Sequence, residues 1–165
     1  MLTGIETASY GKDLDNCSLA DLLCEIDTLG GDFTVRLGSL DPTCLTEQFV
    51  EKIKHLRTLA PHFHISIQSG SSRTLRNMKR KYNADQAIAN MERLRRAIPD
   101  VRFTTDMIVG FPGETEEDFA ETLDFAKRAN FLRYTSFHIP QERARPPQKW
   151  ADRSRPKQKK HAPPS

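Results

Sequence analysis

Apolar and polar residues alternate from Val101 to Gly110, and this alternation predicts a β-strand with two different faces. One face carries Val101, Phe103, Thr105, Met107 and Val109, and the other carries Arg102, Thr104, Asp106, Ile108 and Gly110. The strand ends in a loop at 110–113, whose two glycines let the backbone turn and let another group come close. Thr115 then predicts the start of a helix, with Asp118 as its capping-box partner. A strand, a tight loop and a helix in this order are typical of α/β folds, which bind ligands at the carboxyl ends of their strands.

The rest of the chain repeats this pattern of strand, loop and helix. Apolar residues at helical spacing predict helices that begin after Ser18, Thr46 and Asn83, with a short helix around Leu75 and Met78. Alternating runs predict strands at 33–37, 62–67 and 131–139, and residues 2–6 resemble the end of one more strand. The order is therefore βαβαβαβαβ, and helical connections of this length give parallel neighbours.

Each predicted strand has one apolar face and one polar face. The polar positions are Thr34 and Arg36, then His64, Ser66 and Gln68, then Thr104 and Asp106. A parallel sheet covered on both sides is usually apolar on both faces, so these polar positions indicate a concave surface that lines a hollow. A closed eight-stranded barrel needs about 200 residues or more, so about five parallel strands predict a partial, half-open (β/α) barrel of the TIM type. Its unpaired edge strands favour self-association.

Net charge divides the chain into two parts. The formal charge is +3, but residues 141–165 hold eight Lys or Arg and two acidic residues, which leaves about −3 for the remainder. We therefore expect a barrel domain at 1–140 and a basic, proline-rich, disordered tail at 141–165. No apolar run approaches the roughly 20 residues that span a bilayer. Three widely spaced cysteines favour a reducing cytoplasm over a disulfide framework, and their spacing argues against metal ligation.

Four motifs lie at the ends of the predicted strands. They are LTGIE at 2–6, RLGSLDP at 36–42, PHFHISIQSG at 61–70 and TDMIVGFPGET at 105–115. In this order they resemble the radical S-adenosylmethionine tRNA methylthiotransferases. The branch that acts on threonylcarbamoyladenosine beside the anticodon is the most similar, although Ser71 and Ser72 are also typical of the branch that acts on isopentenyladenosine.

This resemblance implies a fold, two cofactors and a partner. The fold is a half-open (β/α) barrel, the radical SAM core, with cofactor loops on its C-terminal rim. In that family a Cys-x-x-x-Cys-x-x-Cys loop, which would precede Met1, holds a [4Fe-4S] cluster that binds S-adenosylmethionine and cleaves it to a radical. The partner is tRNA, and the implied activity adds a methylthio group to a modified adenosine.

The resemblance also implies cofactor-binding residues in three of the motifs. Gly4 and Glu6 match the loop that contacts the methionine amino group of S-adenosylmethionine. Ser39 belongs to the exit loop of the second motif, and Gln68 and Ser69 match strand-end groups that meet the ribose and the carboxylate.

The fourth motif and the polar strand faces supply the remaining candidates. Ile108 and Gly110 match the segment that passes the adenine of the cofactor. Arg36 and Asp106 are expected to point into the hollow, where Asp106 could pair with the cofactor, with the substrate or with Arg36, because an unpaired carboxylate there is costly. No catalytic residue is assigned.

The chain departs from the family pattern in two places. The sequence contains no Cys-x-x-x-Cys-x-x-Cys: Cys17 and Cys24 are separated by six residues, and Cys44 follows another predicted strand. Residues 137–147 lack the Tyr and Gly of the family's usual last-strand pattern. One hypothesis is a core fragment of a tRNA methylthiotransferase that is inactive alone because the cluster ligands are absent. The alternative is a non-catalytic truncated barrel, or a fragment of another radical SAM enzyme, that binds RNA nonspecifically through its basic tail.

Three further features have both a structural and a functional interpretation. His62 and His64 are either locally hydrogen-bonded or catalytic. Gly110 and Gly113 either make a tight turn or admit a ligand. The basic residues between Arg73 and Lys81 form either a solvated helix face or a contact to tRNA phosphates, which would give a steep salt dependence of binding.

Overall fold

A computed structural model describes residues 1–4, 6–15 and 17–139 of the chain. The expected tail at 141–165, and residue 140 at the end of the expected barrel domain, lie outside the described residues. The domain division therefore stays a prediction.

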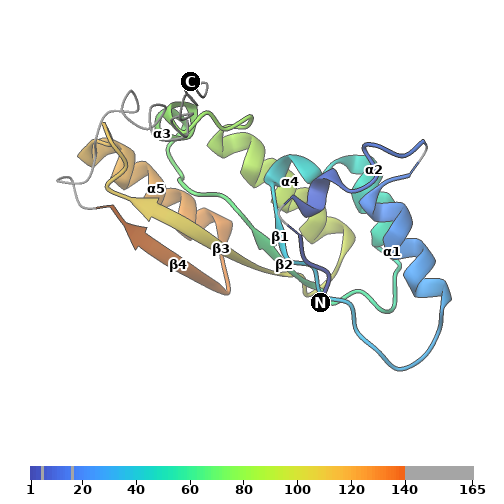
Figure 1. The fold of residues 1–165 in the computed structure, drawn as a ribbon. Coiled ribbons are helices and arrows are strands. Elements are labelled where there is room, and N and C mark those ends of the chain that lie inside the picture. The colour runs from blue at the N-terminus through green and yellow to red at the C-terminus, as the bar shows by residue number, and fades with distance from the viewer. Residues whose placement is uncertain (5, 16, 140–165) are drawn as a thin grey trace, which may run out of the picture.

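Four parallel strands form one sheet, in the order in which they occur along the chain (Figure 1). β1 (Ser39–Leu40) pairs with β2 (His62–Ile65), β2 pairs with β3 (Arg102–Val109), and β3 pairs with β4 (Arg133–His138). A single parallel bridge between Leu2 and Leu37 attaches the N-terminal segment beside this sheet. The sheet is not closed, so the predicted partial barrel of parallel strands is confirmed, with four regular strands in the described residues.

The prediction of a regular strand at 33–37 is wrong. This segment makes only isolated bridges, one from Val35 to Leu59 and one from Leu37 to Leu2, and the regular pairing begins at Ser39. The two bridges lead to different neighbours, so no continuous hydrogen-bond ladder forms. Phe33, which the alternation assigns to the apolar face of this strand, lies before the first bridge and is 40% exposed.

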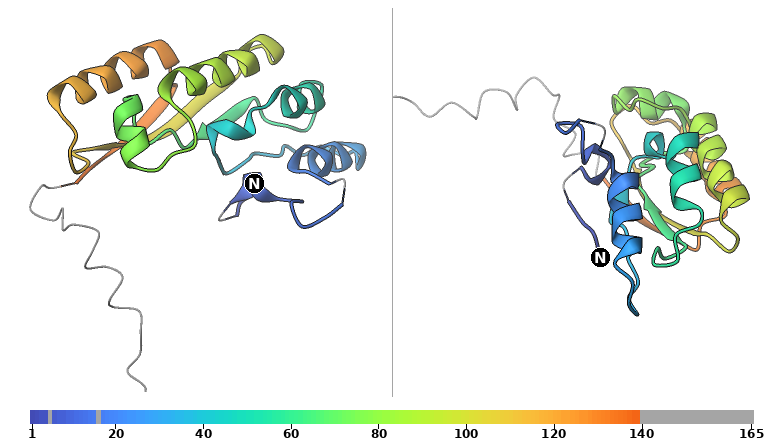
Figure 2. Two further views of the ribbon diagram at one scale, coloured as in Figure 1. Left: turned by 90° about the horizontal axis from the view of Figure 1, so that it is seen from above. Right: turned by 90° about the vertical axis from the view of Figure 1, so that its right-hand side faces the viewer.

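Four helices lie in a row over one face of the sheet (Figure 2). They are α1 (Leu19–Thr28), α2 (Glu47–Ile53), α4 (Ala84–Ala97) and α5 (Glu116–Ala129). The short helix α3 (Ser72–Asn77) follows the loop after β2, and two 3₁₀ turns, η1 (Thr7–Ser9) and η2 (Pro42–Cys44), follow the N-terminal segment and β1. In the described part of the chain the other face of the sheet carries no helix, which leaves the polar strand positions open.

Local sequence explains where these helices begin. Ser18, Thr46 and Asn83 each accept a backbone N–H at the helix N-terminus, as predicted. The capping box of Thr115 and Asp118 is confirmed, and Asn83 forms a second box with Gln86. Leu56 and Leu59 continue the apolar spacing of helix α2, but the helix ends at Ile53, because the chain then turns to pair its backbone with Val35.

The core lies between the helices and the sheet. The apolar strand positions Phe63, Ile65, Ile67 and Phe103 are almost fully buried, as the alternation predicted. They pack in one cluster with helix residues such as Met91, and each large apolar side chain of this kind contributes about 2–3 kcal/mol when buried. Among the described residues, no helix combines the length and the apolar character that crossing a bilayer requires.

Candidate functional site

The open face of the sheet carries a connected row of polar side chains. An Arg36 guanidinium nitrogen lies 3.2 Å from His62 Nε2, and Thr104 Oγ1 lies 3.3 Å from the same nitrogen. Thr104 Oγ1 also lies 3.0 Å from His64 Nδ1, and His64 Nε2 lies 3.3 Å from Asp106 Oδ2. Arg36 and Asp106 therefore lie on one surface, as predicted, but two histidines and a threonine stand between them.

Hydrogen-bond chemistry fixes one donor in this row, the guanidinium of Arg36. His64 Nε2 faces the Asp106 carboxylate and forms an ion pair with it when the ring is protonated. His64 Nδ1 is hydrogen-bonded to the Thr104 hydroxyl, in a direction that the tautomer of the ring sets. The Arg36 guanidinium only donates, so His62 Nε2 is its acceptor. Burial, together with the charge of Arg36, lowers the pKa of His62, which keeps that ring neutral. Both histidines make local contacts, but His62 Nδ1 is buried without a hydrogen-bond partner in the described residues. Asp106 lies next to His64 rather than next to Arg36.

The chain leaves β2 through Gln68, which adopts a left-handed backbone conformation with φ of 73°. Its N–H donates to the carbonyl of Asp106 at 3.0 Å, and its own carbonyl accepts from Ile108 N–H at 2.8 Å. These bonds, with the bridge to Met107, hold Gln68 against the C-terminal half of β3. Three predicted site residues, Gln68, Asp106 and Ile108, are therefore brought together.

The loop after Gln68 is packed directly onto helix α5. The hydroxyl of Ser69 is fully buried and lies 3.2 Å from Thr122 Oγ1, which also accepts from Gly70 N–H. A Cβ at Gly70 would lie 2.7 Å from the Cα of Thr122, so only glycine allows this approach. The Ser69 hydroxyl is thus engaged inside the protein, and its predicted contact to the cofactor stays a prediction.

Asp118 ties the loop after β2 to the loop after β3. Its side chain accepts from Ser71 Oγ at 2.7 Å, from Arg73 Nε at 3.0 Å and from Thr115 N–H at 2.9 Å. Arg73 also donates to Asp118 Oδ2 and to the carbonyl of Gly113 at 3.0 Å. The Arg73 guanidinium holds the pKa of Asp118 well below its usual range. The capping box was predicted from the sequence, but the link through Ser71 and Arg73 was missed, because nothing in their spacing shows that the two loops meet.

The loop after β3 is organised by Glu114. Its Oε2 accepts from Gly110 N–H at 2.5 Å and from Phe111 N–H at 3.3 Å. Gly110 has φ of 78°, and a Cβ there would lie 2.7 Å from the carbonyl oxygen of Ile139. Gly110 is therefore required by the turn itself, whatever its predicted role near an adenine.

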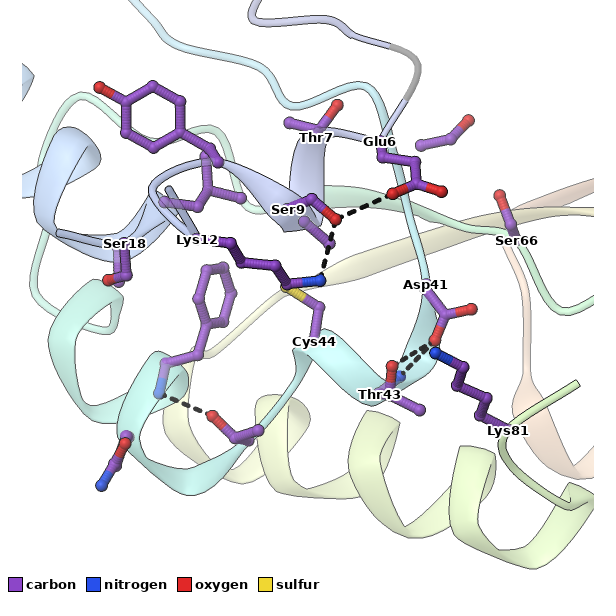
Figure 3. A pocket seen from close by; sticks show the side chains of 18 of the residues that line it. Glu6, Thr7, Ser9, Lys12, Ser18, Asp41, Thr43, Cys44, Ser66 and Lys81 are labelled. Atoms are coloured by element: carbon purple, nitrogen blue, oxygen red, sulfur yellow. Dashed lines mark hydrogen bonds between the residues drawn. The ribbon is translucent and has the colours of Figure 1, made fainter. Parts of the chain in front are cut away.

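A cavity of about 1180 Å³ opens at the C-terminal ends of β1 and β2 (Figure 3). It is lined by polar residues that include the predicted Glu6 and Ser39, together with Asp41, Ser66 and Lys81. Glu6 Oε2 accepts from Ser9 Oγ at 3.0 Å. Gly4 is exposed just before Glu6. The predicted residues thus divide into Gly4, Glu6 and Ser39 at this cavity or beside it, Gln68, Ser69, Asp106, Ile108 and Gly110 around the C-terminal ends of β2 and β3, and Arg36 by itself, beside His62 at the start of β2.

The described cysteines do not form a metal site. Cys17, Cys24 and Cys44 are free thiols, and the described residues contain no group of three or more His, Cys, Asp or Glu that could hold a metal ion. Burial raises the pKa of Cys44 to about 11, so this thiol is protonated at neutral pH and is a poor ligand.

Residues 7–126 match the radical SAM superfamily. The chain is 41% identical over 139 residues to the threonylcarbamoyladenosine tRNA methylthiotransferase MtaB of Thermotoga maritima, a match that covers 84% of this chain and 32% of that protein. It is 44% identical over 131 residues to the tRNA-2-methylthio-N(6)-dimethylallyladenosine synthase of Clostridium tetani, covering 79% of this chain and 29% of that protein. The chain therefore spans about a third of the length of these curated relatives.

A solved structure supports the fold. The cobalamin-dependent S-adenosylmethionine radical enzyme OxsB superimposes with a TM-score of 0.51 at 18% identity, over 73% of this chain and 18% of that one. At this identity the likeness concerns the fold alone, and it agrees with an open sheet of parallel strands covered by helices.

Proposed function

Because the chain belongs to the radical SAM superfamily, with the core of a tRNA methylthiotransferase, we propose that it holds S-adenosylmethionine for the transfer of a methylthio group to tRNA. The substrate we propose is an adenosine that already carries an N6 modification, since relatives named for two such nucleosides lie at 41% and 44% identity. The activity is proposed for this core together with cluster ligands, which the sequence above does not contain.

One observation carries the proposal. The motifs at 61–70 and 105–115 are joined through the backbone bonds of Gln68 to Asp106 and Ile108, next to a polar face that no described helix covers. In α/β folds this end of a parallel sheet is where ligands bind. The match to methylthiotransferases extends across both motifs.

The residues at this junction suit the parts of S-adenosylmethionine. In the described residues the Asp106 side chain has one polar contact, the ion-pair contact to His64, so its carboxylate has capacity left for an ammonium or hydroxyl donor. Ile108 offers an apolar side chain, and Gly110 offers backbone without a side chain, for a flat adenine. When bound, S-adenosylmethionine supplies the radical chemistry of the superfamily, and these residues bind and orient it.

The cysteines of this chain do not fit the iron–sulfur cluster of the family. Their spacing is wrong, and the thiol of Cys44 is held in its neutral form by burial. We therefore assign no step of the reaction to residues of this chain acting through a cluster.

Calorimetric titration of the chain with S-adenosylmethionine tests the proposal. We expect saturable binding that weakens by tenfold or more in Asp106→Asn, because a charge-assisted hydrogen bond contributes about 1.5–3 kcal/mol. The matched control is Asp124→Asn, which changes an exposed carboxylate on α5 and should bind as the unchanged chain does. A chain that binds no S-adenosylmethionine, or equal binding by the two variants, would contradict the assignment.

A partner, a cellular location and an oligomeric state follow from the same proposal. We propose tRNA as the macromolecular partner and the cytoplasm as the location, in keeping with the free thiols. We also propose self-association through β4, an edge strand whose residues are all exposed, including Tyr134 and Phe137. Sedimentation velocity would show a concentration-dependent dimer, and Phe137→Lys should shift it toward monomer.

A further inference from the structure

Three consecutive basic residues, Lys79, Arg80 and Lys81, lie on the wall of the large cavity that also contains Glu6 and Ser39. All three side chains are exposed. In the part of the chain that the structure describes, none of them forms an ion pair within 4 Å, whereas Lys52, which lines the same cavity, is paired with Asp21. A solvated helix face does not explain them, because they follow the end of α3 instead of lying along it.

The basic segment is held in a defined position. Lys79 closes α3 in a left-handed conformation with φ of 58°, and the N–H groups of Lys79 and Arg80 donate to carbonyls of that helix at 2.9 Å. Tyr82 follows directly and is only 5% exposed. Its hydroxyl lies 2.9 Å from the carbonyl oxygen of Ser66 and 2.8 Å from that of Ile67. The tyrosine therefore anchors the three cations to the end of β2, one residue before Gln68.

The lining of the cavity has an excess of positive charge, because two further lysines, Lys12 and Lys52, join the three basic residues of the segment, and the acidic residues of the lining are Glu6, Asp41 and Glu51. Asp41 and Lys81 both line this cavity (Figure 3), and Asp41 Oδ1 accepts from Thr43 N–H at 2.9 Å and from the Thr43 hydroxyl at 2.5 Å. Glu6 is occupied by the hydroxyl of Ser9. A fixed row of unpaired cations at a rim is the chemistry that recognises successive phosphates of a nucleic acid backbone.

We infer that Lys79, Arg80 and Lys81 form a phosphate-binding site for single-stranded RNA, which positions the nucleotides next to the base presented to the cofactor rim. This inference rests on the proposed function, since it takes tRNA as the partner, and it names the surface of this core that would touch it. The contacts are to phosphates, so they set the position of the RNA without reading its sequence.

Binding of a synthetic RNA hairpin with a single-stranded loop, followed by fluorescence anisotropy over a range of NaCl concentrations, tests the site. The test variant is the full chain carrying Lys79→Ala, Arg80→Ala and Lys81→Ala. We expect the slope of log affinity against log salt to fall by about 2, since each single-stranded phosphate contact contributes about 0.7. The matched control carries Arg57→Ala, Lys127→Ala and Arg133→Ala, which removes the same charge from exposed residues near the opposite ends of the strands. In the described part of the chain these three residues also form no ion pair within 4 Å.

The comparison of the two triple variants decides the matter, because the basic tail is the same in both. Equal slopes in the test and control variants would overturn the site while leaving the binding of S-adenosylmethionine, and hence the proposed function, standing. Weaker S-adenosylmethionine binding in the test variant alone would place these cations in the cofactor site and also overturn the inference. Displacement of the RNA by poly-aspartate as effectively as by unlabelled RNA would assign the surface to acidic proteins instead.

Discussion

Asp106 in β3 and Asp118 in the helix that follows it differ in their exposure and in the number of their polar partners. Asp118 at the start of α5 is 3% exposed, and donors from Ser71, Arg73 and Thr115 occupy both of its oxygens. Asp106 in β3 has a side chain that is 34% exposed and one partner, His64. A carboxylate whose acceptor sites are filled by protein donors stabilises the fold, whereas a partly exposed carboxylate with unused acceptor sites can also accept from a ligand. We therefore assign Asp118 to holding the loops after β2 and β3 together, and Asp106 to binding S-adenosylmethionine.

The largest effect should come from Asp118→Ala. This change removes the acceptor that joins the loops after β2 and β3 and leaves Ser71 Oγ and the Arg73 guanidinium without their partner. Losing one partner of a buried pair costs about 3–5 kcal/mol, but Arg73 is half exposed and can turn to water, so we expect about 2–3 kcal/mol. Urea unfolding measures the loss, and Glu121→Ala on the exposed side of α5 should stay within about 0.5 kcal/mol. A loss of less than about 1 kcal/mol of unfolding free energy in Asp118→Ala would contradict the structural role assigned to Asp118.

The pH dependence of stability gives an intermediate effect. The pKa of Asp118 is lower in the folded chain than in the unfolded chain, chiefly because Arg73 donates to it. Its contribution is therefore complete above the unfolded pKa of about 4 and is lost as the pH falls below that value. Thermal unfolding between about pH 6 and pH 3 should show a steeper decline in the unchanged chain than in Asp118→Asn. Parallel curves for the two proteins would contradict the assignment.

The smallest effect on stability is expected on the open face. Thr104→Val removes the hydroxyl that is hydrogen-bonded to His64 Nδ1 while keeping the shape of the side chain. We expect less than about 1 kcal/mol of destabilisation, because the row is partly exposed, but a measurable loss of S-adenosylmethionine affinity, because His64 no longer orients Asp106. Thr135→Val, on the same face in β4, is the control and should leave affinity unchanged. If Thr104→Val were strongly destabilising without weakening the binding of S-adenosylmethionine, the polar row on the open face would have a structural role, as Asp118 does, and not a binding role.

Sequence patterns predicted the parts of this fold that depend on neighbours along the chain. The alternation in β3, the caps at Thr46 and Thr115 and the parallel order of the strands all follow from local spacing, and all are confirmed. Phe33 was misplaced because alternation cannot show that a segment changes neighbours between one residue and the next.

The candidate site was predictable only in outline. Arg36 and Asp106 could be assigned to one face from their strand positions, but His64 as the partner of Asp106 depends on the register between β2 and β3, which the sequence does not encode locally. The tie between Arg73 and Asp118 joins residues 45 positions apart, across two loops of irregular shape. Contacts of this kind follow from the packing of α5 on the loop at Gly70, which only a three-dimensional structure makes visible.

The strand order β1-β2-β3-β4 has a consequence for how the chain is made. A ribosome releases the strands in the order in which they pair, so each new strand meets a partner that has already been synthesised and need not wait for a distant one. The sheet can therefore add one strand at a time at the same edge, and the chain can begin to fold while synthesis continues.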